Sequence, residues 1–146
     1  MIARGQFVPK NIHKYKGDAS KIVYRSSWER RVMVWLDNHP SIIWWNSEET
    51  VVGYRSPIDG KIHRYYPDFL IQVKTKDGKV KTEMWEIKPE AQVGEPERKS
   101  RTTRRYIAEV VRYGINDAKW KAATEYCLDR GWAFRVLTEK DLGLTP

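Results

Sequence analysis

The chain has 146 residues, 40 % of them hydrophobic, and its 27 Lys and Arg against 19 Asp and Glu give a formal net charge of +8. A chain of this length normally forms one domain that buries roughly 70 % of its unfolded surface, so its core needs no disulfide or structural metal. The single cysteine, Cys127, excludes an intramolecular disulfide framework and a cysteine-rich zinc site. No uncharged run is long enough to span a membrane, and no apolar stretch follows Arg4, so we expect neither a membrane protein nor a signal peptide.

Positive charge is concentrated in two segments. Residues 1–25 contain six basic side chains against one acidic side chain, and residues 98–112 have the same ratio. Such patches on a small domain favour a polyanion as partner, most often nucleic acid. A basic surface that serves solubility is the alternative from charge alone. The candidate phosphate-binding residues are Lys10, Lys14, Lys16, Arg98, Lys99, Arg101, Arg104 and Arg105.

The N-terminal residues 1–25 are polar and interrupted by Pro9 and Gly17, which predicts an extended basic arm before a single domain over 26–146. Ser26 followed three residues later by Glu29 forms a capping box, which predicts that a helix begins there. Apolar residues at helical spacing continue to Asn38, and Pro40 ends the pattern. The predicted buried stripe of this helix is Trp28, Val32, Trp35 and Leu36.

After this helix the pattern changes to strands. β-rich runs at 42–45, 51–54, 62–73 and 80–88 predict a meander of three or four antiparallel strands, with turns at 59–60 and 77–78. A loop after Pro89 leads to helical patterning over 102–111, and Asn116 can cap a further helix that ends at Gly131. A last strand is expected over 132–137. This order predicts an α/β fold with a mixed central β-sheet flanked by α-helices.

Candidate chemistry lies in the segments Pro67-Asp68 and Glu86-Ile87-Lys88. Because strand side chains alternate between faces, Glu86 and Lys88 point the same way, and strand pairing can bring Asp68 to them. Two neighbouring carboxylates are costly to hold together unless a cation satisfies them. Mg²⁺ binds one or two carboxylates together with water and substrate phosphate, and Mn²⁺ is the alternative ion. The pattern predicts phosphodiester hydrolysis, with Asp68 and Glu86 as metal ligands and Lys88 serving the attacking water.

These segments form the PD-(D/E)XK signature, and the chain resembles that nuclease superfamily. It also resembles, over nearly its whole length, the head completion nucleases of T-even-like tailed phages. The segments that carry this second resemblance are 9–11, 14–18, 24–29, 56–59, 63–69, 116–123 and 130–135.

The resemblance implies a restriction-endonuclease-like fold and metal-dependent cleavage of packaged double-stranded DNA before tails join heads. It implies an acidic residue on the first helix, which Glu29 matches as a further catalytic residue and metal ligand. Phage head or neck proteins are the implied partners, and the host cytoplasm during phage assembly, or the virion, is the implied location. Transposon-encoded end-cleaving nucleases share a similar core and are the nearest enzymatic alternative.

Simpler interpretations of these residues stay open at this point. Glu29 can be a helix cap, a metal ligand or both. Glu86 and Lys88 can form a cross-strand ion pair on a solvated face. A non-catalytic DNA-binding protein of the phage head-tail junction is therefore the alternative function. The sequence leaves cut-site preference, endonuclease or exonuclease mode, metal number and oligomeric state open.

Overall fold

A computed structural model describes residues 4–143; residues 1–3, the start of the predicted arm, and 144–146 lie outside the described residues. The elements in chain order are β1 (Gly5–Gln6), the 3-10 helices η1 (Ile12–Lys14) and η2 (Ala19–Lys21), β2 (Val23–Tyr24), α1 (Ser27–Asn38), β3 (Ile42–Ser47), β4 (Val52–Arg55), β5 (Ile62–Tyr65), β6 (Phe69–Lys74), β7 (Val80–Ile87), the 3-10 helix η3 (Glu90–Gln92), α2 (Arg104–Asp129) and β8 (Ala133–Leu137).

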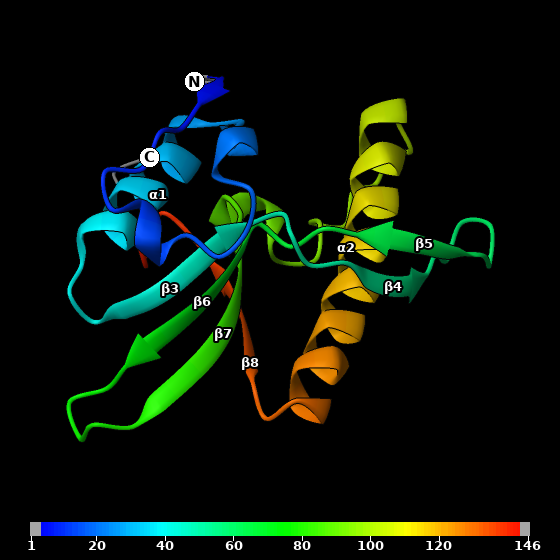
Figure 1. The fold of residues 1–146 in the computed structure, drawn as a ribbon. Helices are drawn as coiled ribbons and strands as arrows, with labels where there is room; N and C mark the ends of the chain where they lie inside the picture. Colours follow the sequence, from blue (N-terminus) through cyan, green and yellow to red (C-terminus); the bar gives the residue numbers. More distant parts are fainter. Residues whose placement is uncertain (1–3, 144–146) are drawn as a thin grey trace.

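A mixed four-stranded sheet in the order β3-β6-β7-β8 forms the centre of the molecule (Figure 1). β3 and β7 both pair antiparallel with β6, whereas β8 runs parallel to β7. β8 can run parallel to β7 because α2 forms the crossover that carries the chain back toward the beginning of β7. The predicted α/β fold with a mixed central sheet and flanking helices is confirmed.

The alternation of side chains along the sheet gives each face its own core. Phe69, Ile71 and Trp85 pack with the residues of α1. Leu70 and Met84 point to the opposite face and pack with α2, where the Cys127 Sγ lies 3.8 Å from the Met84 Sδ. Burial of each such side chain contributes about 1.5–3 kcal/mol, so the sheet fixes both helices through hydrophobic packing.

The N-terminal segment is packed on the α1 side of the molecule. Phe7, Tyr15 and Ile22 are buried in the core that α1 shares with the sheet. The Lys16 N–H donates a hydrogen bond to the Trp45 carbonyl at 2.9 Å, and β1 pairs with β2. The described part of this segment is therefore packed rather than extended; the domain boundary at residue 26 stays a prediction.

The buried face of α1 differs from the predicted stripe. Met33 is fully buried, whereas Trp35 is 46 % exposed. Asp37 is buried as well, and it accepts hydrogen bonds from the N–H groups of Lys10 at 2.9 Å and Asn11 at 3.1 Å. The N-terminal segment thus covers one side of α1, and the helix buries the faces that meet the sheet and this segment.

The predicted meander is divided between two sheets. Pro67 and Asp68 separate the expected run 62–73 into β5 and β6. β5 pairs with β4 across the turn at Asp59-Gly60, as predicted, but this hairpin forms a sheet of its own beside α2 (Figure 1). Pro67 has no N–H to donate to a ladder, which explains why pairing stops there.

Helix α2 is continuous where the sequence predicted two helices. Thr103 caps its N-terminus by accepting a hydrogen bond from the Tyr106 N–H at 3.1 Å. Asn116, the predicted cap of a second helix, lies in the middle of α2 and is buried. Packing of Asn116, Ala123 and Cys127 keeps the helix intact, although Gly114 in a helix interior costs about 1 kcal/mol. Neither this helix nor any other in residues 4–143 is long and apolar enough to cross a membrane.

Candidate active site

The candidate site lies at the end of the sheet where β6 begins and β7 ends. Asp68 directly precedes β6, and the register pairs Phe69 with Trp85, so Asp68 comes beside Glu86. The segment that leaves β3 also reaches this place, because the Glu48 N–H donates a hydrogen bond to the Asp68 carbonyl at 3.2 Å. The structure thus brings Asp68 and Glu86 together at the position that strand pairing predicts.

Asp68 is fixed by the backbone of the neighbouring strand. Its Oδ2 accepts a hydrogen bond from the Ile87 N–H at 2.7 Å. Burial raises the pKa of Asp68 well above its usual value, and the charges of Glu86 and Glu29 raise it further. The carboxyl group is therefore held in place in surroundings that oppose its negative charge.

Glu86 is buried and has partners on two sides. Its Oε1 accepts a hydrogen bond from the Tyr65 hydroxyl at 2.7 Å, and the Lys88 Nζ lies 4.0 Å from its Oε2. Burial raises the pKa of Glu86, while the Tyr65 hydrogen bond and the charges of Lys88 and Lys119 partly offset this effect. Glu86 therefore belongs to a buried polar cluster and not to a solvated surface pair.

Glu29 lies in the capping box at the start of α1, and its charge acts on Asp68. The Ser26 Oγ accepts a hydrogen bond from the Glu29 N–H at 3.1 Å, which caps α1, and lies 3.3 Å from the Glu29 Oε2. Burial raises the pKa of the Glu29 carboxyl, and the nearby charge of Glu48 raises this pKa further. The Ser26 cap of α1 is confirmed, and the role of the Glu29 carboxylate as a metal ligand stays a prediction.

Sequence patterns did not single out Arg25, Glu48, Tyr65 or Lys119 as site residues. Glu48 forms an ion pair with Arg25. Its backbone is left-handed, with a φ of 54°, and no local sequence pattern predicts this conformation. Tyr65 lies three residues before Asp68, and that proximity was the available signal. Lys119 comes from the middle of α2, so the tertiary fold alone brings it to the site.

The donor set matches a hard divalent cation. Within residues 4–143, no three His, Cys, Asp or Glu side chains are arranged to hold an ion by themselves. Asp68 and Glu86 nevertheless present carboxylate oxygens whose mutual repulsion a cation would relieve. Mg²⁺ commonly binds one or two carboxylates and completes its octahedron with water and phosphate, so the two carboxylates fit this ion.

The basic residues that the sequence singled out differ in their availability. Arg98, Lys99, Arg101, Arg104 and Arg105 are all exposed in the loop before α2 and in its first turn. Lys10 and Lys16 are also exposed. Lys14 is buried, and its Nζ donates to the carbonyls of Asp37 at 3.1 Å and His39 at 2.8 Å, so its charge is used inside the fold.

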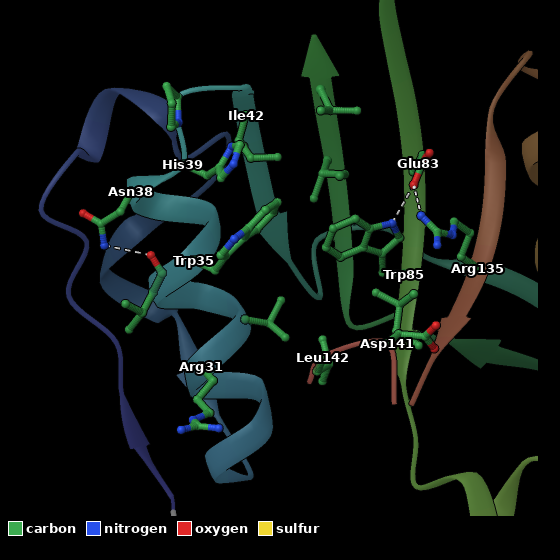
Figure 2. Close-up of a pocket in the computed structure, with 16 residues that line it drawn as sticks. Arg31, Trp35, Asn38, His39, Ile42, Glu83, Trp85, Arg135, Asp141 and Leu142 are labelled. Carbon is green, nitrogen blue, oxygen red and sulfur yellow. Dashed lines mark hydrogen bonds and ion pairs between the residues drawn. The ribbon is translucent and has the colours of Figure 1, made fainter. Parts of the chain in front are cut away.

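A cavity of about 980 Å³ lies elsewhere, between α1 and the sheet (Figure 2). Trp35 and Trp85 line it with ring centroids 6.4 Å apart, and Glu83 binds both the Trp85 Nε1–H and Arg135 at its rim. Because Trp85 and Glu86 are adjacent in β7, they point to opposite faces of the sheet. The cavity is therefore separate from the carboxylate site.

Comparison with known proteins agrees with this geometry. The family model of the TnsA-like endonuclease N-terminal domain matches residues 39–139, which include Asp68, Glu86 and Lys88. The head completion nuclease of Enterobacteria phage T4 is 40 % identical over 146 residues, covering 97 % of this chain and 95 % of that protein. No solved structure matches. The chain therefore belongs to the TnsA-like endonuclease family within the PD-(D/E)XK nucleases, and it is a nuclease.

Proposed function

We propose that this nuclease hydrolyses phosphodiester bonds of double-stranded DNA with Mg²⁺, for which Mn²⁺ can substitute. The observation that carries the proposal is the buried pair of Asp68 and Glu86 with Lys88 at its edge. A structural protein would gain nothing from two buried carboxylates that oppose each other, because such a pair lowers stability unless a cation neutralises it.

In this proposal Asp68 and Glu86 hold the ion, and Glu29 is an auxiliary ligand. When bound, the ion supplies Lewis-acid polarisation of the phosphate and lowers the pKa of the attacking water. Ile87 keeps Asp68 in position through its backbone N–H, and Tyr65 does the same for Glu86 through its hydroxyl. Lys88 orients the attacking water and stabilises the negative charge that develops on the phosphate.

Substrate binding is assigned to the exposed basic residues. They contact backbone phosphates and not base edges, since long flexible cations bind phosphate without reading sequence. Lys14 is not retained among them, because backbone carbonyls bind its ammonium group. The proposed phosphate contacts are Lys10, Lys16, Arg98, Lys99, Arg101, Arg104 and Arg105.

The biological setting is inferred from the relative. The matched T4 protein is a head completion nuclease, and we propose that this chain likewise acts on packaged DNA in an infected host cell before heads and tails join. Head or neck proteins are then its partners, and association with the virion is part of the proposal. The family match also keeps a second function, cleavage at transposon ends, as the alternative.

Cleavage of supercoiled plasmid by the purified protein tests the proposal. We expect nicked and linear products with Mg²⁺ or Mn²⁺ and none in EDTA. Plasmid that stays intact under all metal conditions, although the protein binds it, would favour the non-catalytic structural role. Full cleavage in EDTA would refute the metal-dependent mechanism. Cleavage confined to particular DNA ends would favour the transposon-type function.

A further inference from the structure

The N-terminal half of α2 extends beyond the sheet at the same end as the carboxylates (Figure 1). The buried residues of α2, Asn116, Ala123 and Cys127, all lie in its central and C-terminal turns. Cys127 contacts Met84 in the middle of β7, whereas Lys119 acts on Glu86 near the end of that strand. The first turns of α2 therefore project past the central four-stranded sheet, while the β4–β5 hairpin packs beside the middle of the helix.

Arg105, Arg112 and Lys119 form one line along this helix. They are seven residues apart, and seven residues turn an α-helix by almost two full revolutions. At 1.5 Å per residue, neighbouring members are about 10 Å apart and the whole line is about 21 Å long. We call these three residues the α2 track; Arg105 and Arg112 are exposed, and Lys119 is half-buried.

Lys119 is the end of the α2 track that meets the active site. Its Nζ lies 5.5 Å from the ring centroid of Tyr65 and 5.8 Å from that of Tyr54. The Tyr65 hydroxyl in turn donates to Glu86 at 2.7 Å. Lys119 thus lies where the sheet, the β4–β5 hairpin and α2 meet, one side chain away from a proposed metal ligand.

The three members of the α2 track differ in their acidic neighbours: Arg105 pairs with Glu109, Lys119 acts on Glu86, and Arg112 has no salt bridge among the described residues. Glu109 lies 3.4 Å from Arg105, and water weakens this pair because the Arg105 side chain is exposed. Asp117 pairs instead with Lys121 at 2.9 Å, on another side of the helix, because residues two apart do not share a face. Neither Arg112 nor Lys119 is joined to an acidic side chain by a salt bridge among the described residues.

We propose that the α2 track binds the phosphate backbone of the DNA duplex on one side of the bond that is cut. This inference rests on the proposed function and assigns the path of the substrate. A 21 Å line corresponds to about six steps of 3.4 Å along one strand, so α2 holds about six nucleotides of flanking DNA. Regularly spaced cations of this kind bind phosphates independently of sequence.

Salt dependence of binding tests this inference without cleavage. Affinity for a 24-base-pair duplex is measured by fluorescence anisotropy in EDTA across a salt series, for the full chain and its variants. Each lost phosphate contact should reduce the slope of log affinity against log salt by about 0.9. We expect this reduction of the slope for Arg105→Ala and for Arg112→Ala. Combining Lys119→Ala with either substitution should reduce the slope further. Glu109→Gln should tighten binding, because it removes a repulsive charge.

Lys121→Ala is the matched control, since Lys121 is an exposed lysine of the same helix that faces another way. An unchanged slope for Arg112→Ala, or an equal loss for Lys121→Ala, would overturn the inference. Arg112 is exposed, so its variant should fold normally, and a thermal melt checks this. If the wild type fails to cut plasmid but the slopes change as expected, the proposed function is wrong and the inference that the α2 track binds DNA is supported. If wild type cuts and the slopes do not change, the α2 track alone is wrong.

Discussion

Asp68 and Glu86 are held near each other by hydrogen bonds that do not remove the repulsion between their charges. Replacing Asp68 by Asn keeps an oxygen for the Ile87 N–H and removes one negative charge. We expect Asp68→Asn and Glu86→Gln each to reduce plasmid cleavage at least a hundredfold. Without metal, each should raise the free energy of unfolding by about 1 kcal/mol, because active-site repulsion costs stability.

Thermal melts of these variants in EDTA and in Mg²⁺ check this prediction. Mg²⁺ should raise the melting temperature of the wild type, since an ion that binds only the folded state stabilises it, and should not raise that of Asp68→Asn. Glu125→Ala, which alters an exposed carboxylate of α2, should leave both activity and metal response unchanged. Near wild-type cleavage by either site variant would show that the metal site lies elsewhere.

The proposed roles of Lys88 and Glu29 differ from those of the ligands Asp68 and Glu86, so their variants should keep different properties. Lys88→Ala should abolish turnover yet keep stabilisation by Mg²⁺, because its proposed role concerns water and phosphate. Loss of that stabilisation would place Lys88 among the groups that organise the metal site. Cleavage rates and melting temperatures over the same Mg²⁺ titration give both readouts.

For Glu29, Ser26→Ala provides the matched comparison. It removes the oxygen that caps the Glu29 N–H but leaves the carboxylate in place, so it should lower the free energy of unfolding by about 1 kcal/mol and change the Mg²⁺ affinity less than Glu29→Gln does. Glu29→Gln keeps the backbone cap and should instead weaken the apparent Mg²⁺ affinity in cleavage assays. Equal Mg²⁺ dependence for Glu29→Gln and wild type would leave Glu29 with the capping role alone.

At the scale of elements, the continuity of α2 yields a prediction at Gly114. A methyl group added there would meet the Pro57 Cγ at 3.9 Å, an ordinary van der Waals contact, and the backbone is helical. Gly114→Ala should therefore stabilise the protein by about 0.5–1 kcal/mol. Gly60→Ala is the control and should destabilise it, because Gly60 has a φ of 70° in the β4–β5 turn. If Gly114→Ala instead destabilises the protein in chemical denaturation, the helix is interrupted at residue 114, as expected for two separate helices.

The same elements show what local sequence could and could not predict. The capping box at Ser26 and Glu29 and the turn at Asp77-Gly78 are local signals, and both mark real boundaries. Asn116 also looks like a cap, but burial against the rest of the molecule decided its conformation, and burial depends on residues distant in the chain. Strand alternation likewise predicted that Asp68 and Glu86 converge, whereas Lys119 comes from a separate helix that no spacing rule connects to them.

At the scale of the whole molecule, the basic N-terminal segment is also a structural part of the α1-side core. Its polar and basic residues, interrupted by Pro9 and Gly17, predicted an extended arm, because its irregularly spaced apolar residues give no periodic signal. Asp37 links it to α1 by accepting two backbone N–H bonds, and Lys14 binds the end of the same helix. Any DNA contact by Lys10 or Lys16 would therefore come from a surface held rigidly beside the sheet.

Ile22 provides the test of this arrangement, because it is 1 % exposed and lies in the core shared with α1. Ile22→Ala should lower the free energy of unfolding by about 2–5 kcal/mol, the usual cost of removing a large side chain from a packed core. Val8→Ala is the matched control: Val8 is 76 % exposed, and its variant should differ from wild type by no more than about 0.5 kcal/mol. Urea unfolding followed by tryptophan fluorescence gives both values. A loss below 1 kcal/mol for Ile22→Ala would mean that the segment is a loosely attached arm, and the proposed phosphate contacts at Lys10 and Lys16 would then move independently of the active site.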